Sequence, residues 1–169
     1  MKPKLKILVL RFSSIGDIVL TTPVVRALKV QLEDAEIHFC TKKNYSTIVD
    51  NNPYIDKVHL LEESLNELIV RLKKEQFDYI VDLHNNLRTR LIKLRLGKKS
   101  GTFDKLNRQK WLKVNLKIDH LPNVHIVDRY LEAAKELGVK KDQLGLDYFI
   151  PEKDEVPLEW LPETHQKEY

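Results

Sequence analysis

The sequence predicts an α/β protein with a Rossmann-like parallel sheet and helices on both of its faces. Short continuous apolar runs, of which residues 7–10 are the first, have the pattern of parallel strands covered on both sides. Segments with helical periodicity alternate with these runs, which is typical of strands joined by right-handed helical crossovers. The composition agrees, because 42% hydrophobic residues in a chain of 169 suffice for one full core.

The first unit begins with the strand at residues 7–10, which ends at Arg11. The apolar residues that follow keep a helical period across Pro23, and two interpretations of this stretch stay open. One helix continues through Pro23 with a kink. Alternatively, the helix begins at Pro23 with Thr22 as its N-cap, and residues 17–21 form a loop.

The later units carry start and stop signals of their own. Ser64 and Glu67 have the spacing of a capping box. Gly97 and Gly138 stand where helices are expected to end, because glycine adopts the left-handed conformation that closes a helix. The remaining strands are expected at residues 35–41, 57–61, 77–83 and 100–103, and the helices at 64–75, 87–96 and 123–137, with a short one within 42–56.

The amino-acid composition of the chain changes at Pro151. Residues 151–169 contain three prolines and six acidic against two basic residues. We therefore expect one Rossmann-like domain over residues 1–150 and a Pro-rich acidic linker or terminal segment over 151–169.

Positive charge gathers in residues 88–117. This segment has eleven Lys or Arg residues against Asp104 alone, and because the whole chain carries +4, the remainder carries −6. Such a patch attracts phosphates, acidic sugars, anionic lipid or nucleic acid. A solvated basic helix face is the simpler explanation of the same pattern.

Cysteine usage and hydropathy indicate the cellular compartment and the kind of membrane contact to expect. Cys40 is the only cysteine, so no intrachain disulfide can form, and a reducing cytoplasm fits best. No apolar stretch of the sequence is long enough to span a bilayer, so any membrane contact is expected to be peripheral.

Two polar clusters follow the first and the fourth strands. Parallel strands end at a common edge, where an open α/β sheet binds its ligand, so both clusters should line one crevice. Asp17 is suited to act as a general base, but it can equally be a capping acid whose pKa the helix N-terminus lowers. The first cluster comprises Arg11, Ser13, Ser14, Gly16 and Asp17, and the second comprises Asp82, His84, Asn85 and Arg88.

Other candidate sites are weaker. His84 can serve as base, hydrogen-bond donor or cap, and Arg88 can fork two donors onto a phosphate or carboxylate. His125 and Arg129 lie four residues apart on one expected helix face, although Asp128 makes a surface ion pair the alternative. Because the histidines lack zinc spacings and the chain lacks glycine-rich phosphate loops, no metal and no bound cofactor are expected.

Four stretches of the chain carry a resemblance to a known family. The runs ILVLRFSSIGDIVLTTPVVRALK, AEIHFCTKKNYSTIVDNNPYIDKV, FDYIVDLHNNLRTR and VHIVDRYLEAAKELG resemble the N-terminal half of ADP-heptose:lipopolysaccharide heptosyltransferases, glycosyltransferase family 9. The resemblance covers most of residues 4–150, and S-S-x-G-D followed by T-T-P is its most specific marker. It implies the N-terminal, acceptor-binding half of a GT-B enzyme, inactive alone because the C-terminal donor-binding domain is missing from this chain.

The resemblance also implies roles for the candidate residues. Asp17 falls on the general base of a metal-independent, inverting transfer of heptose or a related sugar, with ADP-heptose as co-substrate rather than cofactor. Family members often have a glycine where Asn85 and Asn86 stand here. Substrate-binding roles fall on Arg11, Ser13, Ser14, Gly16, His84, Asn85, Arg88, His125 and Arg129.

The implied partner is an acidic glycolipid, the lipopolysaccharide core, met by a cytoplasmic protein at the inner face of the inner membrane; nucleic acid is not expected. Two other hypotheses stay open. One is a non-catalytic anion-binding module that uses residues 88–117 on lipid or nucleic acid. The other is a flavodoxin-like or nucleotide-binding domain complete in itself.

Overall fold

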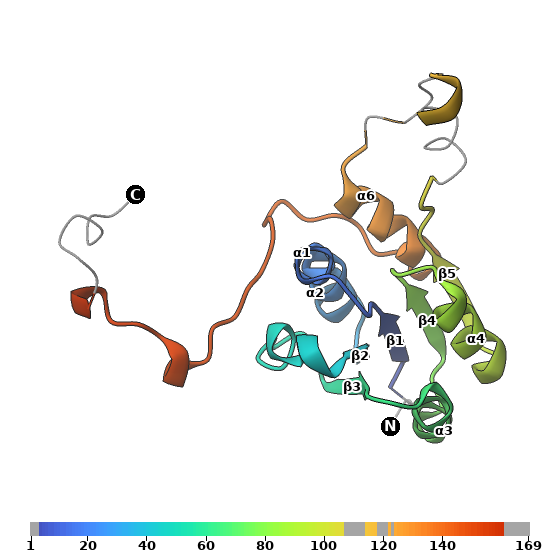
Figure 1. Ribbon diagram of the computed structural model, residues 1–169, viewed down its shortest axis with the longest axis horizontal. Helices are drawn as coiled ribbons and strands as arrows, with labels where there is room; N and C mark the ends of the chain where they lie inside the picture. The colour runs from blue at the N-terminus through green and yellow to red at the C-terminus, as the bar shows by residue number, and fades with distance from the viewer. Residues whose placement is uncertain (1–3, 107–113, 118–121, 123, 161–169) are drawn as a thin grey trace.

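The computed structural model describes residues 4–106, 114–117, 122 and 124–160, and it contains one five-stranded sheet (Figure 1). All neighbouring strands are parallel, in the order β3-β2-β1-β4-β5. The α/β fold class and all five expected strands are confirmed. The strands are β1 (Lys6–Leu10), β2 (Glu36–Lys42), β3 (Lys57–Leu61), β4 (Tyr79–Asp82) and β5 (Lys99–Thr102).

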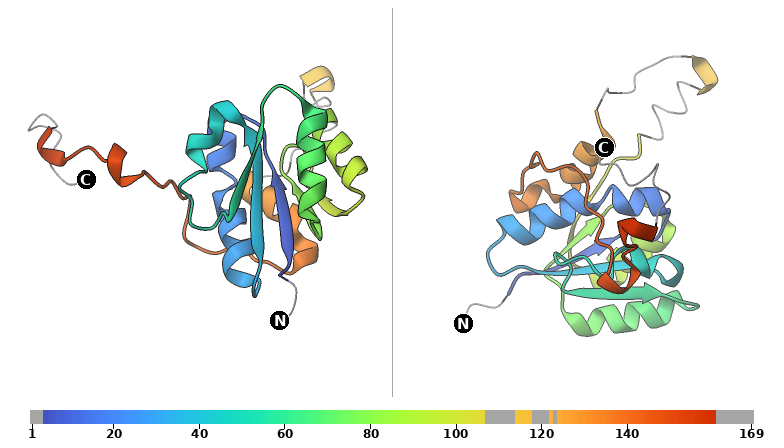
Figure 2. Two further views of the ribbon diagram at one scale, coloured as in Figure 1. Left: turned by 90° about the horizontal axis from the view of Figure 1, so that it is seen from below. Right: turned by 90° about the vertical axis from the view of Figure 1, so that its left-hand side faces the viewer.

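Helices cover both faces of the sheet (Figure 2). The alternation of side chains along β1 shows why, since Ile7 and Val9 belong to one buried cluster and Leu8 and Leu10 to the other. The first cluster is closed by α2 (Thr22–Gln31) and α6 (Ile126–Leu131), and the second by α3 (Leu65–Glu75) and α4 (Leu87–Leu96). The short helix expected within 42–56 is a 3₁₀ helix, η1 (Lys43–Ile48).

The stretch around Pro23 differs from both interpretations. It forms two helices, α1 (Ile15–Val19) and α2, with Thr21 as the N-cap of the second. The hydroxyls of Thr21 and Thr22 donate to carbonyls of α1, which ends the first helix locally. Pro23 lies at the start of α2, where its missing N–H costs no hydrogen bond. As a result, Asp17 lies in a helix rather than in a loop.

The helix expected at 123–137 is also revised. Asn123 lies outside the described residues, and α6 begins at Ile126 with His125 as its N-cap. The second half is a 3₁₀ helix, η2 (Glu132–Leu137), closed by Gly138 in the left-handed conformation as expected. This half packs against β5 so closely that a Cβ atom on Gly101 would lie 1.8 Å from the Ala133 carbonyl oxygen.

The segment after η2 returns across α2 before it leaves the domain. Arg26 of α2 is buried and forms ion pairs with Asp142, at 2.7 Å, and Asp147. The backbone N–H of Asp147 also donates to Thr22 Oγ1 over 2.9 Å. We call these contacts of Arg26 with Asp142 and Asp147 the Arg26 clamp. Beyond it the chain extends away from the sheet through two short 3₁₀ helices, η3 (Glu152–Asp154) and η4 (Leu158–Trp160) (Figure 1). The division into a domain and a linker at residue 150 stays a prediction.

Among the described residues, no helix combines the length and the apolar character that a bilayer crossing requires.

Candidate functional site

Arg11 joins the ends of β1 and β4. The buried guanidinium donates from Nη1 to the Leu83 carbonyl over 2.5 Å and from Nε to the Ser13 carbonyl over 2.7 Å. Its Nη2 lies 2.6 Å from Asp17 Oδ2. The two polar clusters therefore meet at the carboxyl edge of the sheet, as the parallel topology predicts.

Asp17 is the third residue of α1, and Ser14 is the N-cap of the same helix. The Ser14 backbone N–H and hydroxyl donate to Asp17 Oδ2 over 3.2 and 2.9 Å. Burial alone would raise the pKa of Asp17, but the bonds from Ser14 and the Arg11 guanidinium outweigh it, so the pKa is lowered. Asp17 is therefore ionised at neutral pH, its side chain is 38% exposed, and none of these contacts uses Oδ1.

Tyr130 of α6 forms the wall behind this pair. The Arg11 guanidinium lies 5.6 Å from the centre of its ring, and the ring of Phe103 meets it edge-on at 4.8 Å. Burial raises the pKa of the Tyr130 phenol, and the neighbouring Asp17 carboxylate adds to the effect. Sequence reasoning missed Tyr130, because an aromatic residue on an amphipathic helix is indistinguishable from core.

Asp82 shapes the second cluster and is fully buried. Its Oδ1 accepts the backbone N–H groups of His84 and Asn85, and its Oδ2 forms an ion pair with Lys93 at 2.9 Å. Asn85 adopts the left-handed conformation, with φ of 48°, in which asparagine can replace glycine. Asn86 caps α4 by accepting the Thr89 N–H. The two asparagines thus form the turn between β4 and α4, at the positions where the resemblance implied a glycine.

His84 also lies at the carboxyl edge of the sheet, and its own ring is neutral. Burial, and then the charges of Arg11 and Lys105, lower its pKa to about 4 despite Asp82 and Asp17. The ring meets Phe12 edge-on at 5.6 Å, and its buried Nδ1 has no hydrogen-bond partner among the described residues. A neutral imidazole with an unpaired nitrogen is suited to a hydrogen bond with a ligand and poorly suited to act as a base.

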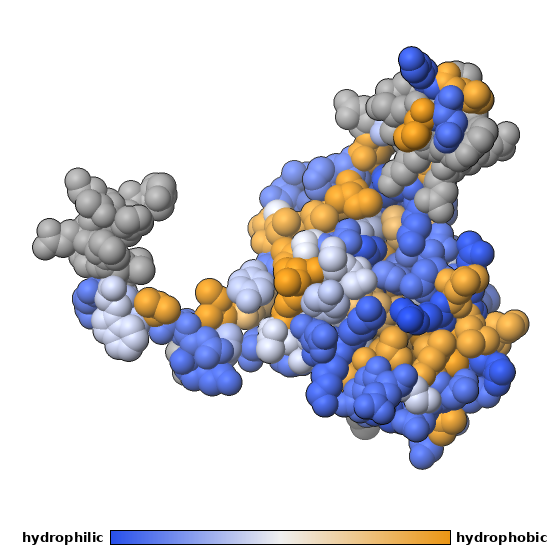
Figure 3. All heavy atoms as spheres, in the orientation of Figure 1, coloured by the Kyte–Doolittle hydropathy of each residue, from blue (hydrophilic) through white to orange (hydrophobic). Residues whose placement is uncertain are grey.

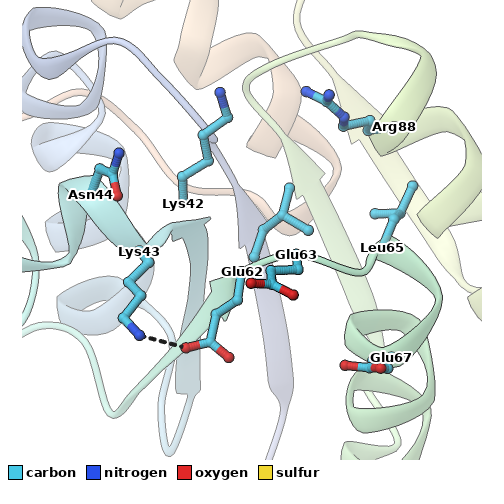
Figure 4. A pocket seen from close by; sticks show the side chains of 9 residues that line it. Lys42, Lys43, Asn44, Glu62, Glu63, Leu65, Glu67 and Arg88 are labelled. Carbon is cyan, nitrogen blue, oxygen red and sulfur yellow. Dashed lines mark ion pairs between the residues drawn. The ribbon is translucent and has the colours of Figure 1, made fainter.

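Arg88 faces a groove beside this cluster. The groove has a volume of about 570 Å³, and its lining combines cations with carboxylates. In Figure 4 the Arg88 side chain points toward the side where Lys42 lies, while Lys43 and Glu62 form an ion pair of 3.1 Å. Sequence reasoning missed the residues after β2 and β3, although they too follow strand ends. The lining residues are Lys42, Lys43, Asn44, Leu61, Glu62, Glu63, Leu65, Glu67 and Arg88.

His125 and Arg129 have separate roles in the structure. His125 is exposed, and its Nδ1 accepts the Val127 N–H as a helix cap. Arg129 donates to the Asp104 carbonyl, and its guanidinium lies 5.8 Å from the centre of the Phe103 ring. The surface ion pair weighed for Asp128 forms with Lys141 instead, at 2.6 Å. Arg129 thus reaches the Asp17 region only through Phe103 and Tyr130.

No family model matches the chain. Among curated proteins, it is 25% identical over 163 residues to lipopolysaccharide heptosyltransferase 1 of Campylobacter coli, covering 85% of this chain and 47% of the relative. It is 24% identical over 153 residues to the lipopolysaccharide core heptosyltransferase OpsX of Haemophilus influenzae, covering 86% and 44%. The chain therefore spans about half the length of the curated relatives it matches.

Solved structures agree on the fold. A glycosyl transferase of family 9 from Veillonella parvula superposes with a TM-score of 0.69 at 20% identity, covering 88% of this chain and 45% of that one. The Escherichia coli heptosyltransferase WaaC with ADP-2-deoxy-2-fluoro heptose gives a TM-score of 0.64 at 19% identity, covering 84% and 51%. The resemblance read from the sequence is thus confirmed: the chain is similar to part of the lipopolysaccharide heptosyltransferases and shares the fold of family 9 glycosyltransferases.

Proposed function

We propose that this chain is the acceptor-binding half of an inverting glycosyltransferase that transfers heptose, or a related sugar, from ADP-heptose to a lipopolysaccharide core acceptor. The names of the relatives support the reaction class, and the coverage of about half of each supports the assignment of one half. The observation that carries the proposal is Asp17, an ionised and partly exposed carboxylate at the ligand-binding edge of a parallel sheet.

In this proposal each neighbour of Asp17 has a task. Arg11 and Ser14 bind Oδ2, which fixes the carboxylate beside the Tyr130 hydroxyl, and we assign Oδ1 to the acceptor hydroxyl. Oδ1 takes the hydroxyl proton while the hydroxyl oxygen attacks the anomeric carbon and the nucleoside diphosphate leaves from the opposite face. His84, neutral beside Arg11, can hydrogen-bond the bound sugar. No step of this transfer uses a metal ion, and we expect the donor to bind residues outside this chain.

The groove lined by Lys42 and Arg88 is the proposed binding site of the acidic acceptor. Arg88 and Lys42 supply cations on one side, where a phosphate or sugar carboxylate can bind. Glu63 and Glu67 supply carboxylates on the other side, where sugar hydroxyls can donate hydrogen bonds. A polar glycan with acidic groups at one end fits both.

Contact with the inner membrane face is proposed for α4. Its exposed residues include Leu87 and Leu94, 81% and 77% exposed, together with Arg88, Arg90 and Arg95. Figure 3 shows hydrophobic and hydrophilic surface side by side on the side of the molecule where Figure 1 places α4. Apolar and basic side chains on one helix are typical of binding to an anionic bilayer surface. Sedimentation with vesicles should show binding that requires anionic lipid and weakens in Leu94→Ser. Part of the basic patch, including Arg108, Lys110 and Lys113, lies outside the described residues.

The decisive experiment is Asp17→Asn in the enzyme that contains this chain together with its donor half. Loss of a general base should reduce transfer by about 10²–10⁴-fold. Acceptor binding and the unfolding transition should stay close to wild type, because the side chain keeps its size and one oxygen.

The matched control is Asp50→Asn, which removes an exposed carboxylate from the turn after η1 and should leave transfer unchanged. Transfer at near-normal rates in Asp17→Asn would overturn the assignment of the base. Steeply salt-dependent binding to anions with no role for Asp17 would favour the anion-binding module instead. Tight, saturable nucleotide binding by the chain alone would favour the self-contained nucleotide-binding domain.

A further inference from the structure

Another polar cluster lies where β2, β3 and α3 meet. His38 of β2 is fully buried, and His59 of β3 is 7% exposed. Their ring nitrogens, His38 Nδ1 and His59 Nε2, are 2.9 Å apart. Glu75, the last residue of α3, completes the cluster, and one ligand atom from each of the three residues lies within 4.8 Å of the others.

The orientation of His38 is set by a carboxylate. Its Nε2 lies 2.7 Å from Glu36 Oε1, and because a carboxylate accepts hydrogen bonds, the ring proton is assigned to Nε2. The lone pair of Nδ1 then faces His59. A histidine whose outer nitrogen donates to a carboxylate while its inner nitrogen faces a shared point is the usual arrangement of a metal ligand.

His59 presents its ring to the same point, with Nε2 2.9 Å from His38 Nδ1 and the residue only 7% exposed. A hydrogen bond of that length between two ring nitrogens requires one proton between them. Metal ions bind neutral imidazole, so a cation there would take the place of that proton.

From this geometry we propose that His38 Nδ1, His59 Nε2 and the Glu75 carboxylate form a binding site for Zn²⁺, with water as the fourth ligand. Metal–nitrogen distances of about 2.0–2.1 Å in a tetrahedron place two ligand nitrogens about 3.3 Å apart. The rings therefore need to separate by only a few tenths of an ångström from 2.9 Å. On binding, the proton of His59 moves from Nε2 to Nδ1 through solvent.

Two lysines compete with the cation for Glu75. Lys57 Nζ lies 2.5 Å from Glu75 Oε1, and Lys6 Nζ lies 3.7 Å from Oε2. The Lys57 side chain is 53% exposed, so it can move into solvent when a cation takes its place. This competition predicts that removing Lys57 strengthens zinc binding.

The site would be structural. Its ligands come from β2, β3 and α3, so a bound ion fastens an edge of the sheet to the helix that covers it. None of its three ligands contacts Asp17 or lines the groove of Arg88. Zinc binding and sugar transfer therefore stand or fall separately.

The test is a calorimetric titration of the tag-free, chelator-treated chain with ZnCl₂, paired with thermal unfolding. We expect one ion per chain and a higher unfolding temperature with zinc. Glu36→Gln should weaken binding by about 10–100-fold through the orientation of His38. Glu75→Gln removes a ligand that is 17% exposed and lies outside the hydrophobic core, and it should weaken binding further, whereas Lys57→Gln should tighten it.

His125→Gln is the matched control, because His125 is exposed and lies in another part of the molecule; it should bind zinc as the wild type does. Should the folded wild type bind no zinc, the cluster is a hydrogen-bonded network and the proposal is wrong. It is also wrong if Glu75→Gln and Glu36→Gln bind zinc with wild-type affinity, because the ion then lies elsewhere.

Discussion

Two buried arginines show how a fold distinguishes structure from function. Arg26 and Arg11 are 3% and 7% exposed, and both pair with aspartates. Arg26 contacts two carboxylates, Asp142 and Asp147, together with the Gly145 carbonyl. Arg11 contacts a single carboxylate, Asp17, together with two carbonyls of its own edge of the sheet.

The difference lies in how much of the partner carboxylate stays open to solvent. Asp142 and Asp147 are 26% and 18% exposed, and the pair fastens a returning segment onto α2. Asp17 is 38% exposed and binds through one oxygen. A buried cation that is fully enclosed holds the fold, whereas one that orients an open carboxylate prepares a site for a ligand.

The largest expected effect on stability follows Arg26→Met. A buried ion pair broken at one end leaves its partners without a cation, at a cost of about 3–5 kcal/mol, which we reduce to about 2–4 kcal/mol because both aspartates are partly solvated. Urea unfolding should report this loss. Arg95→Met, on an exposed position of α4, is the control and should change stability by less than about 0.5 kcal/mol. A loss below about 1 kcal/mol in Arg26→Met would mean that the clamp does not hold the domain together.

Arg11→Met should cost less stability and more function. We expect a loss of about 1–2 kcal/mol, because the single partner carboxylate can be hydrated by water. Without the guanidinium the pKa of Asp17 rises, so the acidic limb of the pH–rate profile of the whole enzyme should move to higher pH. An unmoved acidic limb would show that Arg11 does not set the ionisation of Asp17.

Acid should reduce the difference in unfolding free energy between the wild type and Arg26→Met. Bonding to Arg26 lowers the pKa of Asp142, so this carboxylate contributes stability above its unfolded pKa of about 3.9, and the contribution is lost as pH falls through the lower folded value. Unfolding measured at pH 7 and near pH 3 should therefore give a smaller difference at the lower pH. An equal difference at both would place the effect of Arg26 in packing rather than in charge.

What sequence could predict follows the same division. Strands, helix ends and the convergence of Arg11, Asp17 and His84 rest on local patterns and on a topology that parallel strands impose. The Arg26 clamp could not be predicted, because Asp142 lies 116 residues along the chain and its segment has no regular pattern. Tyr130 could not be predicted for a different reason, because an aromatic residue on an amphipathic helix is indistinguishable from a core residue.

Two local patterns were also decided by contacts elsewhere. The 3₁₀ helix η2 lies against β5, where a side chain at Gly101 would collide with the Ala133 carbonyl. The conformation of the turn at Asn85 could not be predicted, because the glycine that the resemblance implied is absent. The buried Asp82 carboxylate fixes this conformation by accepting two successive backbone N–H groups.

The smallest stability effect is expected from Gly16→Ala. This change also probes the turn beside Asp17, the carboxylate that stays open to solvent. A Cβ atom on Gly16 would meet nothing within 4 Å, and alanine suits a helix better than glycine, so stability should stay level or rise by up to about 1 kcal/mol. Gly97→Ala is the contrasting control, because its φ of 62° should make alanine cost about 1–2 kcal/mol. If the acceptor passes over the S-S-x-G-D turn, the added methyl group of Gly16→Ala should raise the acceptor KM of the whole enzyme without lowering its unfolding free energy. An unchanged KM would place the acceptor path away from this turn, over the groove of Lys42 and Arg88, and would leave Asp17 to meet the acceptor from that side.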